Sequence, residues 1–165
     1  MTEFIEPNPL LIKYVKKSNA LWTEFDSLSQ IFHYSENIIN NEWHYIMSNL
    51  EQNIFLLKRL EERNLLKEEV NICDAGIGLG SALFDLYLQS KEIENKKFNF
   101  YGIEKQQKYI DYFNENLSDN WNGDLTMIVG DIMEHDFSNY NIVYSYSPYR
   151  SPRDLVNYYT KIIKK

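Results

Sequence analysis

CDAGIGLGS, residues 73–81, places an aspartate ahead of three glycines at alternate positions. The chain has 165 residues and six glycines, so half of its glycines lie within five positions. Such a cluster indicates a turn that needs backbone torsions that side chains disfavour, or a close approach that side chains would block. The rest of the sequence must show what approaches this turn.

The segments around this turn alternate between strand and helix patterns. Short apolar runs typical of strands are VNICDA (70–75), KFNFYGIE (97–104), DLTMIVGD (124–131) and NYNIVYSYS (139–147). Helices are predicted over 81–90, over 105–117 and from Pro152, while a loop through His135 joins the last two strands. This order predicts a parallel α/β sheet with right-handed crossovers, whose ligands bind at the carboxyl ends of the strands.

The first 69 residues have a different, helical pattern. Apolar residues recur at steps of three and four over 21–32 and again, more clearly, over 43–60. We therefore predict two amphipathic helices, the second of them long. Trp22, Trp43, His33 and His44 lie beside these apolar positions, and packing is the simplest role for them.

Composition narrows the classes of function. A formal net charge of −7 does not favour a nucleic-acid-binding protein, because that affinity comes largely from clustered Lys and Arg. The three histidines show no metal-ligand spacing, so no metal site is predicted. Cys73, the single cysteine, lies in an apolar run and is expected to be buried and inert. The sequence shows no secretion signal or membrane span, which predicts a cytoplasmic protein.

Charged residues at the predicted strand ends indicate the ligand. Asp74 precedes the glycine turn, where a carboxylate suits an ammonium or sulfonium better than a pyrophosphate. Glu104 ends the second strand, where it can accept hydrogen bonds from both hydroxyls of a ribose. Asp131 ends the third strand and is placed to meet an adenine amino group, with Ile132 covering the ring face. The competing dinucleotide fingerprint G-x-G-x-x-G is disfavoured, because Ser81 stands where its third glycine belongs.

Three motifs in order give the chain a family resemblance. DAGIGLG with Asp74 and its glycines Gly76, Gly78 and Gly80, YGIE with Glu104, and GDI with Asp131 and Ile132 resemble the motifs of class I S-adenosylmethionine (SAM)-dependent methyltransferases. The resemblance runs from about residue 70 to the last residue and implies a Rossmann-like sheet with helices on both faces and SAM as cofactor. The expected cofactor contacts also include Ala75, Lys105 and Ser145, which adjoin these motifs.

The fourth strand leads into the segment that lines the methyl-transfer site in that family. Here it is VYSYSPYR (143–150), which loosely resembles the N-P-P-Y motif of enzymes that methylate amino groups. Tyr146 replaces the asparagine and Ser147 the first proline, so the amino-group substrate is not carried over. Tyr146, Ser147 and Tyr149 remain the candidate substrate-side residues. The expected function is a methyltransferase of unknown acceptor, and the alternative is a non-catalytic SAM-binding sensor or interaction module.

The chain departs from the family's seven-stranded core, because the sequence stops at KIIKK after the helix that follows the fourth strand. We therefore divide it into a helical N-terminal cap (1–69) and a truncated SAM-binding domain (70–165). The fourth strand would form an open sheet edge, and such edges are usually covered or paired. Three explanations stay open: the N-terminal helices cover this edge, a homodimer pairs through it, or the chain is a fragment or truncation of a longer protein.

Overall fold

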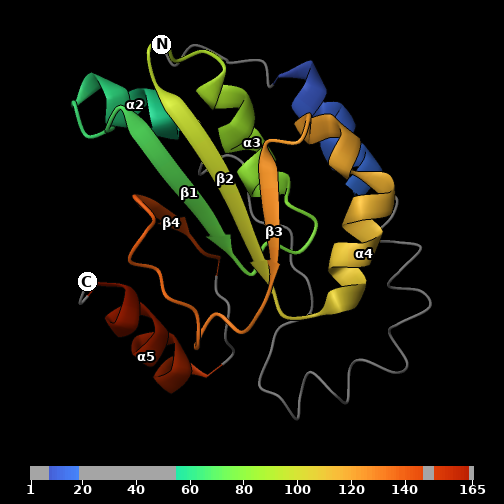
Figure 1. The fold of residues 1–165 in the computed structure, drawn as a ribbon, viewed down its shortest axis with the longest axis vertical. Coiled ribbons are helices and arrows are strands. Elements are labelled where there is room, and N and C mark those ends of the chain that lie inside the picture. Colours follow the sequence, from blue (N-terminus) through green and yellow to red (C-terminus); the bar gives the residue numbers. More distant parts are fainter. Residues whose placement is uncertain (1–7, 19–54, 147–150, 164–165) are drawn as a thin grey trace, which may run out of the picture.

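A computed structural model describes residues 8–18, 55–146 and 151–163, and Figure 1 shows its ribbon. The core is a parallel four-stranded sheet with the order β3-β2-β1-β4. Its strands are β1 (Glu69–Ala75), β2 (Lys97–Glu104), β3 (Leu125–Val129) and β4 (Ile142–Tyr144). The predicted parallel α/β architecture is confirmed.

Helices cover both faces of this sheet, as predicted. The helical elements are residues 9–18, α2 (Leu56–Glu62), α3 (Ser81–Ser90), α4 (Gln107–Asn116), the 3-10 turn η2 (Ser118–Trp121) and α5 (Pro152–Ile163). The α5 helix lies on one face, and residues 9–18, α2, α3 and α4 lie on the other. The predicted helix over 21–32 lies outside the described residues. Most of the predicted helix over 43–60 also lies outside them, and α2 is its described part.

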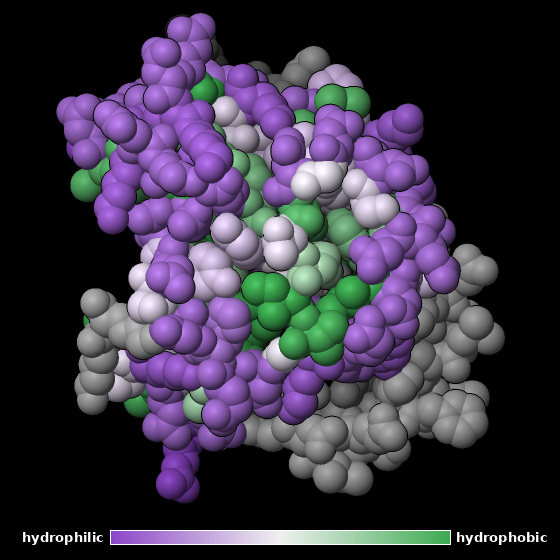
Figure 2. Space-filling model, in the orientation of Figure 1, coloured by the Kyte–Doolittle hydropathy of each residue, from purple (hydrophilic) through white to green (hydrophobic). Residues whose placement is uncertain are grey.

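Alternation along the strands gives the sheet two separate apolar layers. Ile72 of β1 packs into the larger layer, which is rich in aromatic residues and includes Trp121. Cys73, the next residue, packs into the smaller layer beneath α5 together with Tyr158. Cys73 is fully buried, as predicted, and burial raises the pKa of its thiol. The α5 layer is the thinner of the two, and in Figure 2 hydrophobic side chains gather at the centre of this face between hydrophilic margins.

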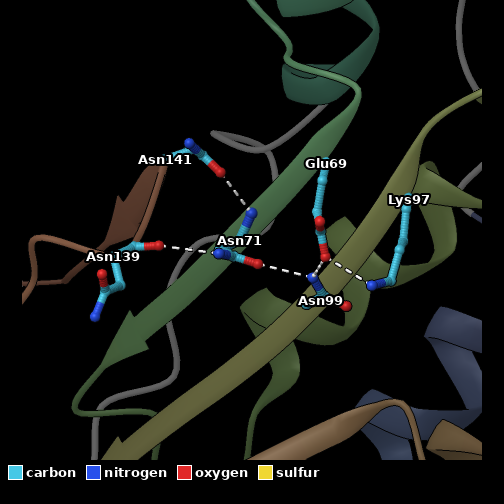
Figure 3. A network of polar contacts seen from close by, with 6 residues as sticks. All are labelled: Glu69, Asn71, Lys97, Asn99, Asn139 and Asn141. Carbon is cyan, nitrogen blue, oxygen red and sulfur yellow. Dashed lines mark hydrogen bonds and ion pairs between the residues drawn. The ribbon is translucent and has the colours of Figure 1, made fainter.

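A polar network fixes the start of the edge strand β4 (Figure 3). The backbone N–H of Asn71 in β1 donates to the side-chain oxygen of Asn141 at 2.7 Å, and its side-chain amide donates to the carbonyl of Asn139. Asn99 of β2 in turn donates to the side chains of Asn71 and Glu69. These contacts align β1, β2 and the approach to β4 near the beginnings of the strands. The carboxyl ends of the same strands are thereby held in a fixed order.

Two strands are shorter than their apolar runs predicted. β4 spans three residues of the predicted 139–147, and the segment before it is held to Asn71 of β1 by the Asn139 carbonyl and by the side chain and backbone N–H of Asn141. β3 ends at Val129, and Gly130 already donates to the carbonyl of Glu104. Of the helices that the structure describes, none is both long and apolar enough to cross a membrane.

Candidate functional site at the carboxyl ends of the strands

The glycine turn joins the end of β1 to the start of α3. All three glycines have left-handed backbone torsions, with φ of 86° at Gly76, 53° at Gly78 and 75° at Gly80. The N–H groups of Gly76 and Ile77 both donate to the carbonyl of Ile103, at 2.9 and 3.0 Å, which ties the turn to β2. Glycine is therefore required at these positions by the left-handed backbone conformation, which other residues avoid. A side chain added at Gly76 would meet no atom within 4 Å, so this position leaves room for another group.

Two buried carboxylates flank this turn on neighbouring strands. Asp74 pairs with Gly102 across the β1–β2 ladder, so Glu104 lies two residues further along at the same sheet edge. Only 4% of Asp74 and 9% of Glu104 is exposed. Glu104 accepts hydrogen bonds from the N–H of Gly78 at 3.2 Å and from the N–H of Gln106 at 2.9 Å. Both of its oxygens are thus oriented by backbone donors.

The electrostatics of the pair favour a positively charged ligand. Burial, and as a smaller cause the nearby Glu104 charge, together raise the pKa of the Asp74 carboxyl from its ordinary 3.8 to about 8. Near neutral pH, Asp74 therefore carries a proton unless a cation compensates its charge. The two acids differ because Glu104 is stabilised by N–H donors, so the proton of the pair is assigned to Asp74.

The turn after β3 brings together two further predicted cofactor residues. Asp131 accepts from the N–H of Met133 at 2.8 Å through one oxygen, and its other oxygen lies 3.3 Å from the ammonium of Lys105. Lys105 directly follows Glu104, so the end of β2 reaches the acid of the third motif. Ile132 is only 8% exposed and packs into the α5 layer, which leaves little of its side chain for a ligand.

The structure describes only some of the residues predicted to line the substrate side of the site. Ser145 and Tyr146 follow β4, and Tyr146 exposes 42% of its surface. Ser147 and Tyr149 lie outside the described residues. Because Asp74 pairs with Tyr144, Ser145 stands level with Ala75 at the sheet edge. Ala75 is 2% exposed and packs beneath α5, so its backbone is the part that could face a ligand.

The N-terminal helix contributes contacts to the turn that the sequence analysis missed. The Tyr14 hydroxyl donates to the carbonyl of Leu79 at 2.8 Å, inside the glycine turn, and accepts from the indole N–H of Trp121 at 3.3 Å. Ser18 and Ser81 share a hydroxyl hydrogen bond of 3.1 Å at the start of α3. The signal was the spacing of the buried residues at positions 11, 14 and 18, which is the period of one helix face.

Within the described part of the chain, no three His, Cys, Asp or Glu side chains are grouped as metal ligands. His135 shares a hydrogen bond of 3.0 Å between its Nε2 and the hydroxyl of Tyr140. His33 and His44 lie outside the described residues.

No protein-family model and no curated protein sequence matches the chain. Solved structures do resemble it. A methyltransferase from Podospora anserina, PaMTH1, solved with S-adenosylhomocysteine (SAH) bound, aligns over 98% of this chain and 58% of its own, with a TM-score of 0.60 and 14% identity. A dimethyladenosine transferase from Plasmodium falciparum aligns over 73% of this chain and 39% of its own, with a TM-score of 0.52 and 16% identity.

The methyltransferase domain of bacterial CtHen1-CN aligns over 70% of this chain and 60% of its own, with a TM-score of 0.50 and 16% identity. The chain has a class I methyltransferase fold. It spans less than two thirds of the length of each of these three proteins. In this methyltransferase fold, the glycine turn and the acids Asp74, Glu104 and Asp131 share the edge at which the parallel strands end.

Proposed function

We propose that this chain binds SAM at the carboxyl ends of β1 to β4 and transfers its methyl group to an acceptor. The observation that carries the proposal is the left-handed glycine turn between two buried carboxylates, Asp74 and Glu104. A buried acid whose pKa is raised to about 8 is stabilised in its charged form by a cationic ligand. SAM carries such positive charge on its ammonium and sulfonium groups.

The described residues fit the parts of SAM one by one. A carboxylate has about four lone-pair sites, so Glu104 can keep its two backbone donors and still accept from ribose hydroxyls. Asp131 has its own oxygens held by Met133 and Lys105, which orients the side chain for an adenine amino group. The open side of Gly76 lets the ligand approach the backbone closely.

The same features argue against a dinucleotide. A pyrophosphate at this turn would bring negative charge next to Asp74 and Glu104. Burial and the charge of Glu104 already disfavour a negative charge on Asp74, so further negative charge is unfavourable there. The start of α3 is also occupied, since Ser81 bonds to Ser18 where a dinucleotide fold needs a glycine.

Methyl transfer asks little of the protein beyond alignment. The bound cofactor supplies an electrophilic methyl group on its sulfonium, and the chain's residues have to place a nucleophile in line with it and exclude water. We assign acceptor orientation to Tyr146, Ser147 and Tyr149, because they follow β4 in the sequence and β4 runs parallel to the strands whose carboxyl ends form the proposed site. Tyr146 is the described member of this set and is exposed enough to meet an acceptor.

The test is SAH formation from SAM in the presence of small-molecule, peptide and RNA fractions of a cell lysate. We expect one class of fraction to give turnover, and we expect Tyr146→Ala to lower that turnover much more than SAM affinity. The matched control is Tyr159→Ala, which removes an exposed tyrosine from α5, outside the set of predicted site residues. Saturable SAM binding without turnover in any fraction would contradict the transfer step and support a sensing module.

A further inference from the structure

The helix over residues 9–18 docks on the larger apolar layer through one buried face. Leu11, Tyr14 and Ser18 lie on this face and are all buried. Leu11 and the ring of Tyr14 form its apolar part, and the Tyr14 ring stacks on Phe84 of α3 with the ring centroids 4.0 Å apart. Burial of these apolar groups is enough to favour docking of the helix. The two hydroxyl groups on the same face therefore need a separate explanation.

The hydroxyl of Tyr14 donates into the glycine turn with a fixed polarity. An indole N–H can only donate, so Trp121 donates to the Tyr14 oxygen at 3.3 Å. The proton of Tyr14 is directed to the carbonyl of Leu79 at 2.8 Å. No more than 2% of any of these three residues is exposed. Water therefore cannot replace a lost hydrogen bond here unless the structure moves locally.

The Leu79 carbonyl lies next to the residue that orients Glu104. The N–H of Gly78 donates to Glu104, and the next residue, Leu79, accepts from Tyr14. Adjacent residues of the turn are thus held from β2 and from the N-terminal helix. The contact at the helix is close, because a side chain added at Gly80 would lie 3.3 Å from the Tyr14 hydroxyl oxygen. A shift of Leu79 therefore also disturbs the donor of Glu104.

Ser18 makes a second contact, one helical turn after Tyr14. Its hydroxyl donates to the carbonyl of Val15 at 3.0 Å, so its oxygen accepts from the Ser81 hydroxyl at 3.1 Å. Ser81 is the first residue of α3 and directly follows the glycine turn. The N-terminal helix therefore contacts both the turn and the start of the helix behind it.

We propose that Tyr14 is a positioning residue for cofactor binding, whose hydroxyl keeps the glycine turn in the conformation that receives SAM. Without this hydroxyl, the buried Leu79 carbonyl has to find another donor, and the turn leaves that conformation in a fraction of the molecules. Affinity falls in proportion to the fraction that stays receptive. The coupling is reciprocal, so bound SAM stabilises the docked helix as much as the helix favours SAM. This inference rests on the proposed SAM site but not on the transfer reaction.

Calorimetric titration of folded Tyr14→Phe with SAM and SAH tests the proposal. We expect the Kd of both ligands to rise by about five-fold or more. Tyr87→Phe is the matched control, because it removes a buried hydroxyl from the same apolar layer, and that hydroxyl accepts from Asn122. Its Kd should stay within about two-fold of the wild-type value. A Tyr14 that only stabilises the fold would lower the denaturation midpoint and leave the Kd unchanged.

The outcomes separate this inference from the proposed function. Equal Kd values for wild type, Tyr14→Phe and Tyr87→Phe overturn the positioning role and leave the SAM site in place. A folded wild-type chain that binds no SAM overturns the proposed function, and the positioning role with it.

Hydrogen exchange of the wild-type chain tests the reciprocal effect. Saturating SAM should slow exchange of the amides of residues 13–18 by about five-fold or more beyond the slowing in α2. The α2 helix is the control because it packs in the same layer and bonds to Gln89, near the far end of α3. Equal slowing in the two helices contradicts the coupling between helix 9–18 and the cofactor.

A serine pair decides the question if Tyr14→Phe does not fold. Ser18→Ala removes the contact with Ser81 at the start of α3. Ser90→Ala is its control, because this buried hydroxyl donates to the carbonyl of Tyr87 at the other end of the same helix. We expect Ser18→Ala to weaken SAM binding by about two-fold or more relative to Ser90→Ala. Equal SAM affinity in the two variants overturns the proposal.

Discussion

The backbone N–H of Gly78 donates to the carboxylate of Glu104 at 3.2 Å, which couples the glycine turn after β1 to the end of β2. The sequence separates these residues by 26 positions. Glu104 therefore orders the turn, and in the proposed site it also presents its remaining lone pairs to the cofactor. Variants at this residue must therefore separate lost folding from lost binding.

Glu104→Gln tests the ribose assignment with little change of shape. The amide keeps one acceptor oxygen but loses the charge, so we expect SAM and SAH affinity to fall by about 1.5 to 3 kcal/mol. Both ligands should be affected alike, since both carry the ribose. Calorimetric titration measures the change, and Glu115→Gln on the exposed face of α4 is the control. Unchanged affinity in a folded Glu104→Gln protein would remove this residue from the site.

Gly76→Ala and Gly123→Ala form a matched pair. The two glycines have φ of 86° and 80°, and an added side chain would meet no atom within 4 Å at either position. Each alanine should cost about 1 to 2 kcal/mol of unfolding free energy, from the left-handed torsion alone. Only Gly76→Ala should weaken SAM binding, because only Gly76 adjoins the proposed site. Equal SAM affinity in both variants would contradict the close approach to the turn.

Asp74 should make stability fall as the pH rises. Its pKa is about 8 in the folded chain and near 3.8 in the unfolded chain, so between these values the folded state holds the extra proton. Stability should then decline with pH over this window, by at most about 1.4 kcal/mol per pH unit. Urea unfolding of wild type and Asp74→Asn at several pH values isolates the effect, since other groups contribute equally to both. A parallel pH dependence in the two proteins would show that Asp74 is ionised in the fold.

Tyr14→Phe tests whether the N-terminal helix supports the glycine turn. The change leaves the buried carbonyl of Leu79 without its hydroxyl donor and the Trp121 indole without its acceptor. We expect a loss of about 1 to 3 kcal/mol in unfolding free energy. Tyr159→Phe, which removes a hydroxyl from a more exposed ring, should change the denaturation midpoint little. Equal midpoints for all three proteins would mean that the Tyr14 contact does not contribute.

Much of the fold could be predicted because local pattern and tertiary role agree. The runs over 81–90 and 97–104 became α3 and β2 with the predicted bounds, since each has one apolar pattern and a clear end signal. The end of β3 and the start of β4 could not be predicted, because the Asp131 carboxylate closes a local turn by accepting from the N–H of Met133, and the Asn141 side chain accepts from the N–H of Asn71 in β1. An apolar run does not show such side-chain contacts.

The candidate site, like the fold, could be predicted from the sequence only in part. Asp74, Glu104 and the glycines follow from motif spacing, and the structure places them at one sheet edge. The support from Tyr14 joins segments that are 65 residues apart, and no local pattern specifies that partner. The burial of Ile132 also depends on α5, which lies far along the chain.

Calorimetric titration of the wild-type chain with SAM, SAH and NAD tests the central claim most directly. The account predicts that SAM and SAH each bind saturably at one site per chain and that NAD gives no binding heat. It also predicts that Gly76→Ala weakens binding of SAM and SAH while Gly123→Ala does not. Saturable NAD binding, or no binding of SAM by folded protein, would contradict the assignment of the carboxyl ends of the strands as a SAM site.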